Sequence, residues 1–432
     1  MTLSERDHSV VWHPFTQHKT SSMQTPIVRG EGAYLIDENN NRILDLISSW
    51  WVNLHGHAHP EIAKAIYTQA MQLEHTVFSG FTHEPAIQLA EQLLEILPPA
   101  FSKIFYTDNG STAVESALKI AYQYWHNRGE KKRQRFIGFK NGYHGDTFGA
   151  MSVGKKSGFF APYEDLFFSV DFFSYPSTWT NDSAVEKKEQ AVLTELDQHL
   201  KLYADETAAM ILEPLVQGAG GMQMCRPEFL QQLEQLVRSH GVLIIYDEVM
   251  TGFGRTGEYF ACLKANTTPD IICLSKGITG GFLPLAVTAC QEFIYQGFLS
   301  DSIGTALLHG HSYTAHPIGC AAALASLKIL KSPEVARQQK MIENTHRVAL
   351  SELRDTVDQQ RYCGTIAAFN LKMSPTYGSN VSEKLRKQLL KKGLLLRPLG
   401  NVIYFLPPYC ISEADLKNAY AILIEEIQGV TA

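Results

Sequence analysis

The chain of 432 residues is 45% hydrophobic and 19% charged, which is enough for a large core and for two or three domains. Its 38 basic and 44 acidic side chains give a net charge of -6, so the composition gives no reason to expect nucleic acid or an acidic membrane surface as a partner. No apolar run approaches the roughly 18 residues of a membrane span, and the N-terminus lacks the apolar segment of a signal peptide. The seven cysteines form no C-x-x-C pair, so we expect a cytoplasmic globular protein with reduced cysteines.

The first 55 residues combine a hairpin signal with a pair of tryptophans. Alternating apolar residues on both sides of the asparagine run 39–41 predict two strands joined by a turn. If the following S-S-W-W segment is also a strand, its neighbouring side chains face opposite ways. Either Trp50 or Trp51 would then line a pocket; alternatively, both pack between subunits or domains.

Three histidines at alternate positions, His55, His57 and His59, invite comparison with a metal site. Gly56 and Pro60 mark a turn there, and neither a cysteine nor a carboxylate joins the set. The sequence therefore predicts no metal centre at these positions.

The next segment leads from two helices to a candidate anion site. Residues 60–98 have helical periodicity, with Pro85 at a first-turn position. A strand at 104–107 then passes through D-N-G into a long helix that begins near Ser111. Free N–H groups and the helix dipole make such a start a phosphate site, with hydroxyls from Ser111 and Thr112 to help. Alternatively, Ser111 only caps the helix.

Two further loops follow predicted strands. A glycine-rich loop with Tyr143 at its tip comes after the strand R-F-I-G-F, so Tyr143 would stack on a flat cofactor or pack within the loop. Residues 155–205, which include a charged helix at 184–202, are interpreted as an insertion. The strand A-A-M-I-L then ends at Glu213, which would reach the substrate or an active-site arginine, or would cap a neighbouring helix.

The central stretch of the chain carries the strongest chemical signal. Residues 242–246 and 271–274 are short, β-branched apolar runs of the kind found in buried parallel strands. Asp247 follows the first run directly, and Lys276 comes two residues after the second. We expect both side chains at the carboxyl ends of neighbouring strands, where open α/β sheets bind their ligands.

An acid and an amine in this arrangement suit pyridoxal 5′-phosphate. The amine of Lys276 would form a Schiff base with the aldehyde, and Asp247 would pair with the ring nitrogen and keep the ring electron-poor. Either residue alone is equally typical of any α/β protein. The G-F-G-R-T-G run at 252–257 resembles a dinucleotide fingerprint, but no long helix follows its glycines, so we reject that reading.

The remainder of the chain predicts the domain organisation. Charged helices around 333–355, 381–392 and 412–428 alternate with strands near 365–372, 394–397 and 402–406. We predict an α/β fold with a large domain at 56–330 and a smaller α+β domain at 331–432, which the segment 1–55 joins. Arg397 is a candidate carboxylate clamp, since guanidinium binds carboxylates through two hydrogen bonds; a surface arginine is the alternative.

Taken together, the motifs resemble the class III aminotransferases over nearly the whole chain. The resemblance rests on D-E-V-M-T-G-F-G-R-T-G, on the twenty-nine residues from Asp247 to Lys276, and on G-H-S-Y-T-A-H-P. It implies a fold-type I transferase with a mostly parallel central sheet and helices on both faces. W-H-P-F-T, S-S-W-W, D-N-G-S and V-Q-G-A-G-G-M narrow it to members of the biotin pathway. Those members convert 8-amino-7-oxononanoate to 7,8-diaminononanoate with S-adenosylmethionine as amino donor.

The resemblance also implies cofactor roles. Lys276 would hold pyridoxal 5′-phosphate and be the catalytic residue, while Asp247 would pair with the ring nitrogen. Gly110 and Ser111 would bind the phosphate, and Tyr143 would cover the ring. The site would be shared in a homodimer, because three residues from the partner subunit would complete it: His311 and Ser312 at the phosphate and Gly310 at the substrate.

At the substrate end, Trp50 would wall the channel and Arg397 would take the carboxylate of each substrate in turn, with Tyr143 and Lys276 also in contact. Two positions depart from the pattern. Relatives have the segment W-H-P-Y-T, in which the tyrosine contacts substrate, whereas this chain has Phe15 at that position. Met250 occupies a position where other class III enzymes commonly have glutamine, which argues against ornithine or 4-aminobutyrate as substrate. Another class III ω-amino acid aminotransferase, or a non-catalytic cofactor-binding member, remain the alternatives, and lysine remains an alternative donor.

Overall fold

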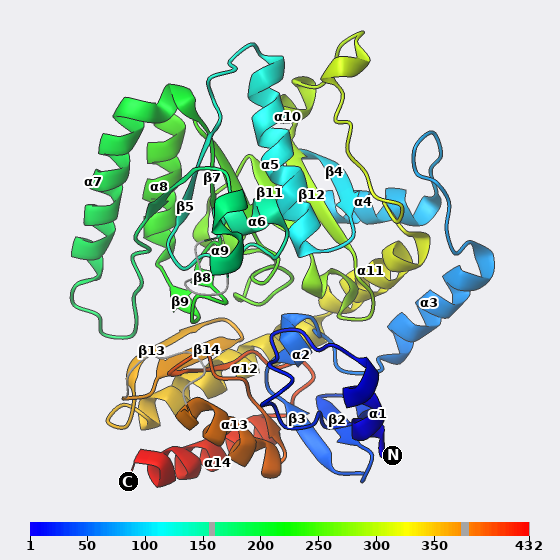
Figure 1. Cartoon of the computed structure of the whole chain (residues 1–432), viewed down its shortest axis with the longest axis vertical. Helices are drawn as coiled ribbons and strands as arrows, with labels where there is room; N and C mark the ends of the chain where they lie inside the picture. Colours follow the sequence, from blue (N-terminus) through cyan, green and yellow to red (C-terminus); the bar gives the residue numbers. More distant parts are fainter. Residues whose placement is uncertain (155–159, 373–379, 432) are drawn as a thin grey trace.

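The computed structural model describes residues 1–154, 160–372 and 380–431. In Figure 1 a large sheet with its helices occupies the upper part of the molecule, and the N-terminal and C-terminal segments of the chain make up the lower part. The predicted insertion 155–205 includes residues 155–159, which lie outside the described residues. The predicted charged helix within it is α7 (Val185–Tyr203).

The large sheet has seven strands in the order β4-β12-β11-β10-β7-β5-β6. The pairs β11–β10, β10–β7, β7–β5 and β5–β6 are parallel, whereas β12 is antiparallel to both of its neighbours. This confirms the predicted mostly parallel α/β fold. The strands are β4 (Phe101–Thr107), β5 (Arg135–Phe139), β6 (Val170–Phe173), β7 (Thr207–Leu212), β10 (Leu243–Asp247), β11 (Ile271–Leu274) and β12 (Ala286–Gln291).

Helices cover both faces of this sheet, which explains its unbroken apolar strands. Every residue of β7, β10 and β11 is buried. Ile245 packs in a cluster with Ala113 of α5, and the next residue, Tyr246, packs on the opposite face with Phe229 of α8. The helices in this part are α3 (Pro60–Gln72), α4 (Glu84–Ile96), α5 (Gly110–Asn127), α6 (Phe148–Val153), α7, α8 (Pro227–Ser239), α9 (Ala261–Ala265), α10 (Glu292–Gln296) and α11 (Pro317–Leu330).

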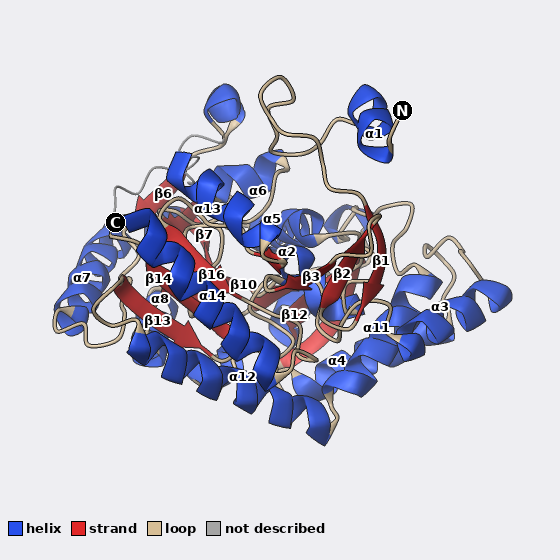
Figure 2. Ribbon diagram, turned by 90° about the horizontal axis from the view of Figure 1, so that it is seen from below, coloured by secondary structure: helices blue, strands red, loops and turns tan. Residues whose placement is uncertain are grey.

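The ends of the chain meet in a second sheet of order β1-β2-β3-β15. The predicted hairpin consists of β2 (Tyr34–Asp37) and β3 (Arg42–Asp45), and β1 (Ile27–Glu31) precedes it. β3 pairs in parallel with β15 (Leu394–Leu395), a strand from the other end of the chain, and the register sets Leu44 opposite Leu394 and Asp45 opposite Leu395. An N-terminal helix, α1 (Leu3–Val10), lies apart from this sheet in Figure 2.

The C-terminal region has its own sheet, β13 (Asp358–Cys363), β14 (Ile366–Asn370) and β16 (Val402–Phe405). Figure 2 shows α12 (Pro333–Glu352), α13 (Asn380–Lys391) and α14 (Glu413–Thr431) gathered around it. β13 was not predicted, because D-Q-Q-R-Y-C has no apolar alternation. The domain boundaries at 55/56 and 330/331 stay a prediction.

The tryptophan segment is not a strand. It forms α2 (Ser48–Trp51), a tight turn in which Ser48, Ser49 and Trp51 have φ of 51°, 61° and 70°. This left-handed conformation is uncommon for residues other than glycine and persists only where the surroundings fix it. Here the Ser48 hydroxyl donates to the Leu406 carbonyl at 2.7 Å, and the indole N–H of Trp51 donates to the Tyr404 hydroxyl at 3.1 Å.

Two of the three histidines of the following turn have hydrogen-bond partners within the protein. His55 Nε2 lies 3.0 Å from Ser326 Oγ, and His57 Nε2 lies 3.0 Å from Asp45 Oδ2. In the part of the chain that the structure describes, no three His, Cys, Asp or Glu side chains form a group that could hold a metal ion. None of the helices in residues 1–154, 160–372 and 380–431 is both long and apolar enough to cross a membrane.

Candidate active site

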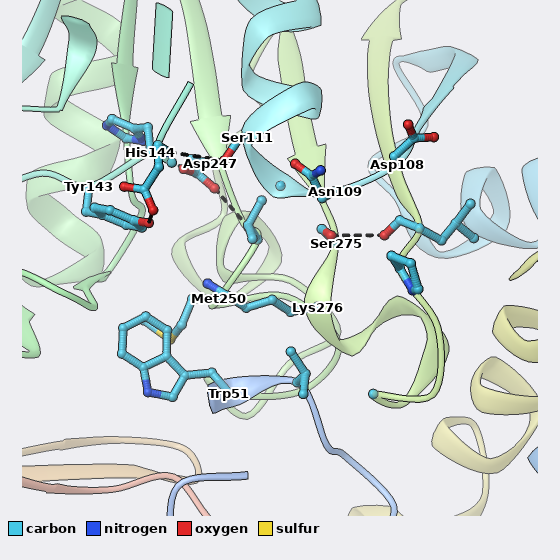
Figure 3. Close-up of a pocket in the computed structure, with 18 of the residues that line it drawn as sticks. Trp51, Asp108, Asn109, Ser111, Tyr143, His144, Asp247, Met250, Ser275 and Lys276 are labelled. Atoms are coloured by element: carbon cyan, nitrogen blue, oxygen red, sulfur yellow. Dashed lines mark hydrogen bonds and ion pairs between the residues drawn. The ribbon is translucent and has the colours of Figure 1, made fainter. Parts of the chain in front are cut away.

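A cavity of about 650 Å³ opens at the carboxyl ends of β7, β10 and β11. Asp247 and Lys276 both line it, as the strand pattern predicted (Figure 3). The remaining walls come from the start of α5, from the loop after β5 and from α2 of the tryptophan turn, with these residues among them: Asn109, Gly110, Ser111, Tyr143, His144, Thr147, Glu213, Val249, Met250 and Trp51.

Lys276 directly follows Ser275 at the end of β11 and begins a short 3-10 turn, Lys276–Thr279. Its φ of 45° is strained for a side chain that is not glycine, and such strain is typical of functional positions. Figure 3 shows the side chain crossing the cavity beside Trp51, and its Nζ lies 4.7 Å from the centroid of the indole ring. Burial lowers the pKa of the Lys276 amine, although Asp247 and Glu213 oppose the shift. A lowered pKa brings the amine closer to its nucleophilic neutral form.

Asp247 ends β10 with 4% of its surface exposed. Its Oδ1 accepts the Val249 N–H at 3.0 Å, and its Oδ2 lies 2.7 Å from Nδ1 of His144. Burial alone lowers the pKa of His144, but the hydrogen bond and charge of Asp247 outweigh it and raise that pKa. The pair therefore favours a cationic ring against an ionised carboxylate.

The sequence did not predict the role of His144. The signal was its position beside Tyr143 in the same glycine-rich loop, but nothing local indicates that its ring turns towards a residue 103 positions away.

The start of α5 shows that Ser111 does not cap the helix, which was the alternative to a phosphate site. Asn109, not Ser111, is the N-cap: its Oδ1 accepts the Thr112 N–H at 3.1 Å, and the Thr112 hydroxyl in turn accepts the Asn109 N–H at 3.0 Å. The N–H groups of Gly110 and Ser111 have no acceptor within the helix, since the first turn of any helix leaves such donors over. The dipole of this 18-residue helix adds positive potential at the same place. An anion could therefore bind there.

Two glycines keep this anion site open. A Cβ on Gly145 would lie 2.2 Å from Ser111 Oγ, and Gly145 also has a φ of 130°. A Cβ on Gly110 would lie 2.8 Å from the side chain of Val249. The loop after β5 can approach the helix start because Gly145 has no side chain, and the loop after β10 can do so because Gly110 has none.

Tyr143 lines the cavity from that loop, and its hydroxyl donates to Asp146 at 2.9 Å. Burial raises the pKa of Tyr143, so its hydroxyl stays protonated. Glu213 has none of the predicted helix-cap or arginine contacts among the described residues. Instead Glu213 accepts the backbone N–H groups of Tyr143 and Gly218 at 3.0 and 2.8 Å.

A second pocket of about 320 Å³ adjoins the first, and Tyr143, Trp51 and Lys276 line both. Phe15, Trp50 and Arg397 come together only here, along with Phe160, Ala219, Leu399 and Tyr404. The guanidinium of Arg397 lies 4.2 Å from the centroid of the Trp50 ring, and the Phe15 and Trp50 centroids are 5.6 Å apart. Stacking of this kind holds the cation at the pocket without neutralising it.

The structure does not bring the other predicted residues into these pockets within one chain. Gly310 and Ser312 are exposed, and His311 Nδ1 lies 3.8 Å from Asp108 Oδ2 of the same chain.

Met250, in contrast, lines the first cavity and is 5% exposed. A Cβ added to Gly218 would lie 3.0 Å from the Met250 methyl group.

The residues present fit pyridoxal 5′-phosphate. The cavity offers a buried amine, a buried carboxylate anchored by His144, a helix N-terminus with free donors, and an aromatic ring from Tyr143. The Thr147 hydroxyl also lines the cavity and, among the described residues, is buried without a hydrogen-bond partner. An aldehyde, a pyridine nitrogen and a phosphate need partners of these three kinds.

Comparison with known proteins agrees with this chemistry. A family model described as aminotransferase class-III matches residues 15–427. The adenosylmethionine-8-amino-7-oxononanoate aminotransferase of Synechococcus elongatus is 51% identical over 426 residues, which cover 98% of this chain and 99% of that protein. The solved structure of the enzyme of the same name from Methanocaldococcus jannaschii is 37% identical, with a TM-score of 0.92 and coverage of 99% of this chain and 98% of that one. A PLP-bound amine transaminase from an uncultivated Pseudomonas species is 29% identical, with a TM-score of 0.87 and coverage of 98% of both chains.

Proposed function

We propose that this chain, which belongs to the class III aminotransferases, transfers the amino group of S-adenosylmethionine to 8-amino-7-oxononanoate with pyridoxal 5′-phosphate as cofactor. The product would be 7,8-diaminononanoate, an intermediate of biotin biosynthesis. Two half-reactions would follow one another, with the donor leaving before the keto acid binds.

One observation carries the chemical part of this proposal: Lys276 and Asp247 end neighbouring parallel strands and line one cavity. When bound there, pyridoxal 5′-phosphate supplies an electron-withdrawing ring that stabilises negative charge on the carbon bearing the substrate nitrogen. Asp247 would pair with the ring nitrogen, and its hydrogen bond to His144 holds the carboxylate in place. Lys276 then moves the proton at the reacting carbon, for which its lowered pKa suits it.

The other residues of the site bind and orient. The N–H groups of Gly110 and Ser111 hold the phosphate, and Tyr143 covers one face of the ring. In the second pocket Arg397 binds the substrate carboxylate through two hydrogen bonds, and the Trp50 ring beside it walls the channel. Phe15 packs beside Trp50 in the same pocket and has no hydroxyl to contribute.

A cytoplasmic homodimer with shared sites is part of the proposal. The exposed loop that carries Gly310, His311 and Ser312 would reach the phosphate and substrate of the partner subunit. Leu308 and Tyr313 on either side of it are 73% and 59% exposed in the single chain, which supports an interface that covers them. Light scattering of the purified protein tests this assembly.

Absorption spectroscopy tests the reaction. The cofactor band of the loaded protein should shift when S-adenosylmethionine is added, and 8-amino-7-oxononanoate should restore it with release of 7,8-diaminononanoate. Lys276→Ala is the matched control and should show neither change. A band that responds to an ω-amine or to lysine but not to S-adenosylmethionine would assign the chain to a different class III reaction. A band that responds to no amine would indicate a non-catalytic member.

A further inference from the structure

Glu213 is a buried carboxyl group in the wall of the cavity that the proposed reaction does not use. It follows β7, whereas Asp247 ends the adjacent strand β10. We propose that Glu213 is a positioning residue, which ties together the two loops that set the aromatic walls of the cavity. This inference rests on the proposed function, because it concerns the site at which that reaction would occur.

The two carboxylate oxygens of Glu213 accept hydrogen bonds from two different loops. Oε1 accepts the N–H of Tyr143 at 3.0 Å, and Oε2 accepts the N–H of Gly218 at 2.8 Å. Tyr143 belongs to the loop after β5, and Gly218 follows the short strand β8 (Val216–Gln217). A single side chain therefore fixes the distance between two backbones that are 75 residues apart in sequence.

Each of these loops sets one wall. Tyr143 carries one aromatic ring itself. Gly218 supports the other, because a Cβ on it would lie 3.1 Å from the Trp51 ring and 3.0 Å from the methyl of Met250. A small shift of Gly218 would therefore displace Trp51, whose ring lies 4.7 Å from the Lys276 amine.

Only an ionised carboxylate suits both N–H groups equally, since a carboxylate accepts at both oxygens and donates at neither. A protonated acid or a glutamine would turn one donor towards one of the two N–H groups. The loop backbone is also under strain, since Leu215 and Met222 have φ of 64° and 49°, so it has little tendency to hold this geometry unaided.

The groups around Glu213 have opposing effects on its pKa. Burial raises the pKa of Glu213 to about 7, with His144 lowering it, Asp247 raising it, and the two N–H groups lowering it. The carboxyl group also interacts electrostatically with Lys276, Tyr143 and Tyr175. The acceptor form is therefore complete only above neutral pH, and the aromatic walls should loosen as the pH falls through about 7.

The next strand supplies a matched control. Glu248 follows β10, is also fully buried, and accepts two backbone N–H groups, those of Ala261 and Cys262 at 2.6 and 2.8 Å. Burial raises its pKa to about 7 as well. Glu248 is not among the residues that line the cavity, and its two N–H donors belong to α9, which does not line it either, so its loss should cost mainly stability.

The experiment compares Glu213→Gln with Glu248→Gln in the full chain. Pyridoxal 5′-phosphate affinity is measured by absorption titration between pH 6 and 9, together with KM, kcat and the unfolding temperature. We expect similar losses of unfolding temperature in both variants. Only Glu213→Gln should weaken cofactor binding and raise KM, each about tenfold, as for one buried hydrogen bond. The cofactor affinity of the wild type should fall below about pH 7, and this fall should be absent in Glu213→Gln.

Equal cofactor affinity, KM and pH dependence in the two variants would overturn the inference. If Glu213→Gln does not fold, Glu213→Asp replaces it, because the shorter carboxylate keeps the charge but cannot span both N–H groups; wild-type values for it would also overturn the inference. If the wild type fails to use S-adenosylmethionine, the proposed reaction is wrong. The cofactor titration still decides the role of Glu213 in that case, since it needs no amino donor.

Discussion

The cavity around Lys276 and the adjoining pocket around Trp50 are built from different kinds of structure. The first lies at the ends of neighbouring parallel strands, where Asp247 is only 4% exposed. The second is assembled from segments that are distant in sequence, and two of its residues are open to solvent in the single chain, with Phe15 51% and Trp50 37% exposed. The sheet alone therefore places the residues for cofactor chemistry, whereas substrate contacts depend on how the two ends of the chain pack.

This difference separates two properties of the enzyme. Buried strand ends hold a reacting amine and its counter-charge in fixed positions, which transfer chemistry requires. Half-exposed loops can change their side chains with little cost to the core, so they suit the selection of a substrate. Substitutions in the first region should thus affect every substrate alike, and those in the second should affect substrates selectively.

The largest effect should come from Lys276→Ala. Removal of the amine removes the group that moves the proton, so turnover should fall by roughly 10⁴-fold with every donor. Single-turnover absorption measurements with saturating cofactor check this. The unfolding temperature should change little, because the variant also removes a buried, costly ammonium. Turnover that falls for one donor only would contradict the assignment of Lys276 to the common chemistry.

His144→Ala should show that the first region is held together by charge. The substitution leaves the Asp247 carboxylate buried without its nearest cation, which costs about 3 kcal/mol of folding free energy. Bound pyridoxal 5′-phosphate would offer Asp247 a replacement cation, so the loss of unfolding temperature should be larger without cofactor than with it.

The control for this comparison is His55→Ala. His55 is also buried, but burial lowers its pKa to about 3 and its partner is the Ser326 hydroxyl, so it carries no charge. Its loss should cost the same with and without cofactor. Equal losses for His144→Ala in the two states would mean that the histidine only fills space.

The sequence predicted the first region well because strand patterns are local. Apolar runs, their lengths and the residue that follows each run placed Asp247 and Lys276 at one edge of the sheet. The helix start near Ser111 was also predicted, but its cap at Asn109 was not, since asparagine and serine are both favourable N-cap residues and both occur here.

Features that depend on distant contacts were not predictable in this way. The left-handed turn of α2 depends on Leu406 and Tyr404, more than 350 residues away in sequence, so the sequence of this segment did not predict the turn. The pairing of His144 with Asp247 is likewise visible only once β5 and β10 lie in one sheet. In the second pocket, Phe15 was proposed from family resemblance alone, whereas Trp50 and Arg397 were candidates from the sequence that the resemblance favoured; no local pattern brings the three together.

Arg397→Ala should affect the second region alone. Loss of a bidentate carboxylate contact of about 2 kcal/mol should raise KM for 8-amino-7-oxononanoate roughly 30-fold, while cofactor affinity stays at its wild-type value. Arg397→Lys is the matched variant: it keeps the charge but loses the planar fork, so it should recover only part of the affinity. Steady-state kinetics and a cofactor titration check both. A cofactor affinity that falls in step with KM would mean that the two regions are not separable.

The smallest effect should come from Phe15→Tyr, which adds one hydroxyl to the most open wall of the second pocket. Phe15 packs against Trp50 at a centroid distance of 5.6 Å and is half exposed, so the added group can reach solvent without strain in the free protein. A hydrogen bond to bound substrate is worth about 1 kcal/mol net, which would lower KM for one of the two substrates up to roughly fivefold and leave the other unchanged. Steady-state kinetics with each substrate varied in turn measure this change. Equal shifts for both substrates, or any change in cofactor affinity, would show that the outer wall acts on the common chemistry and not on substrate selection.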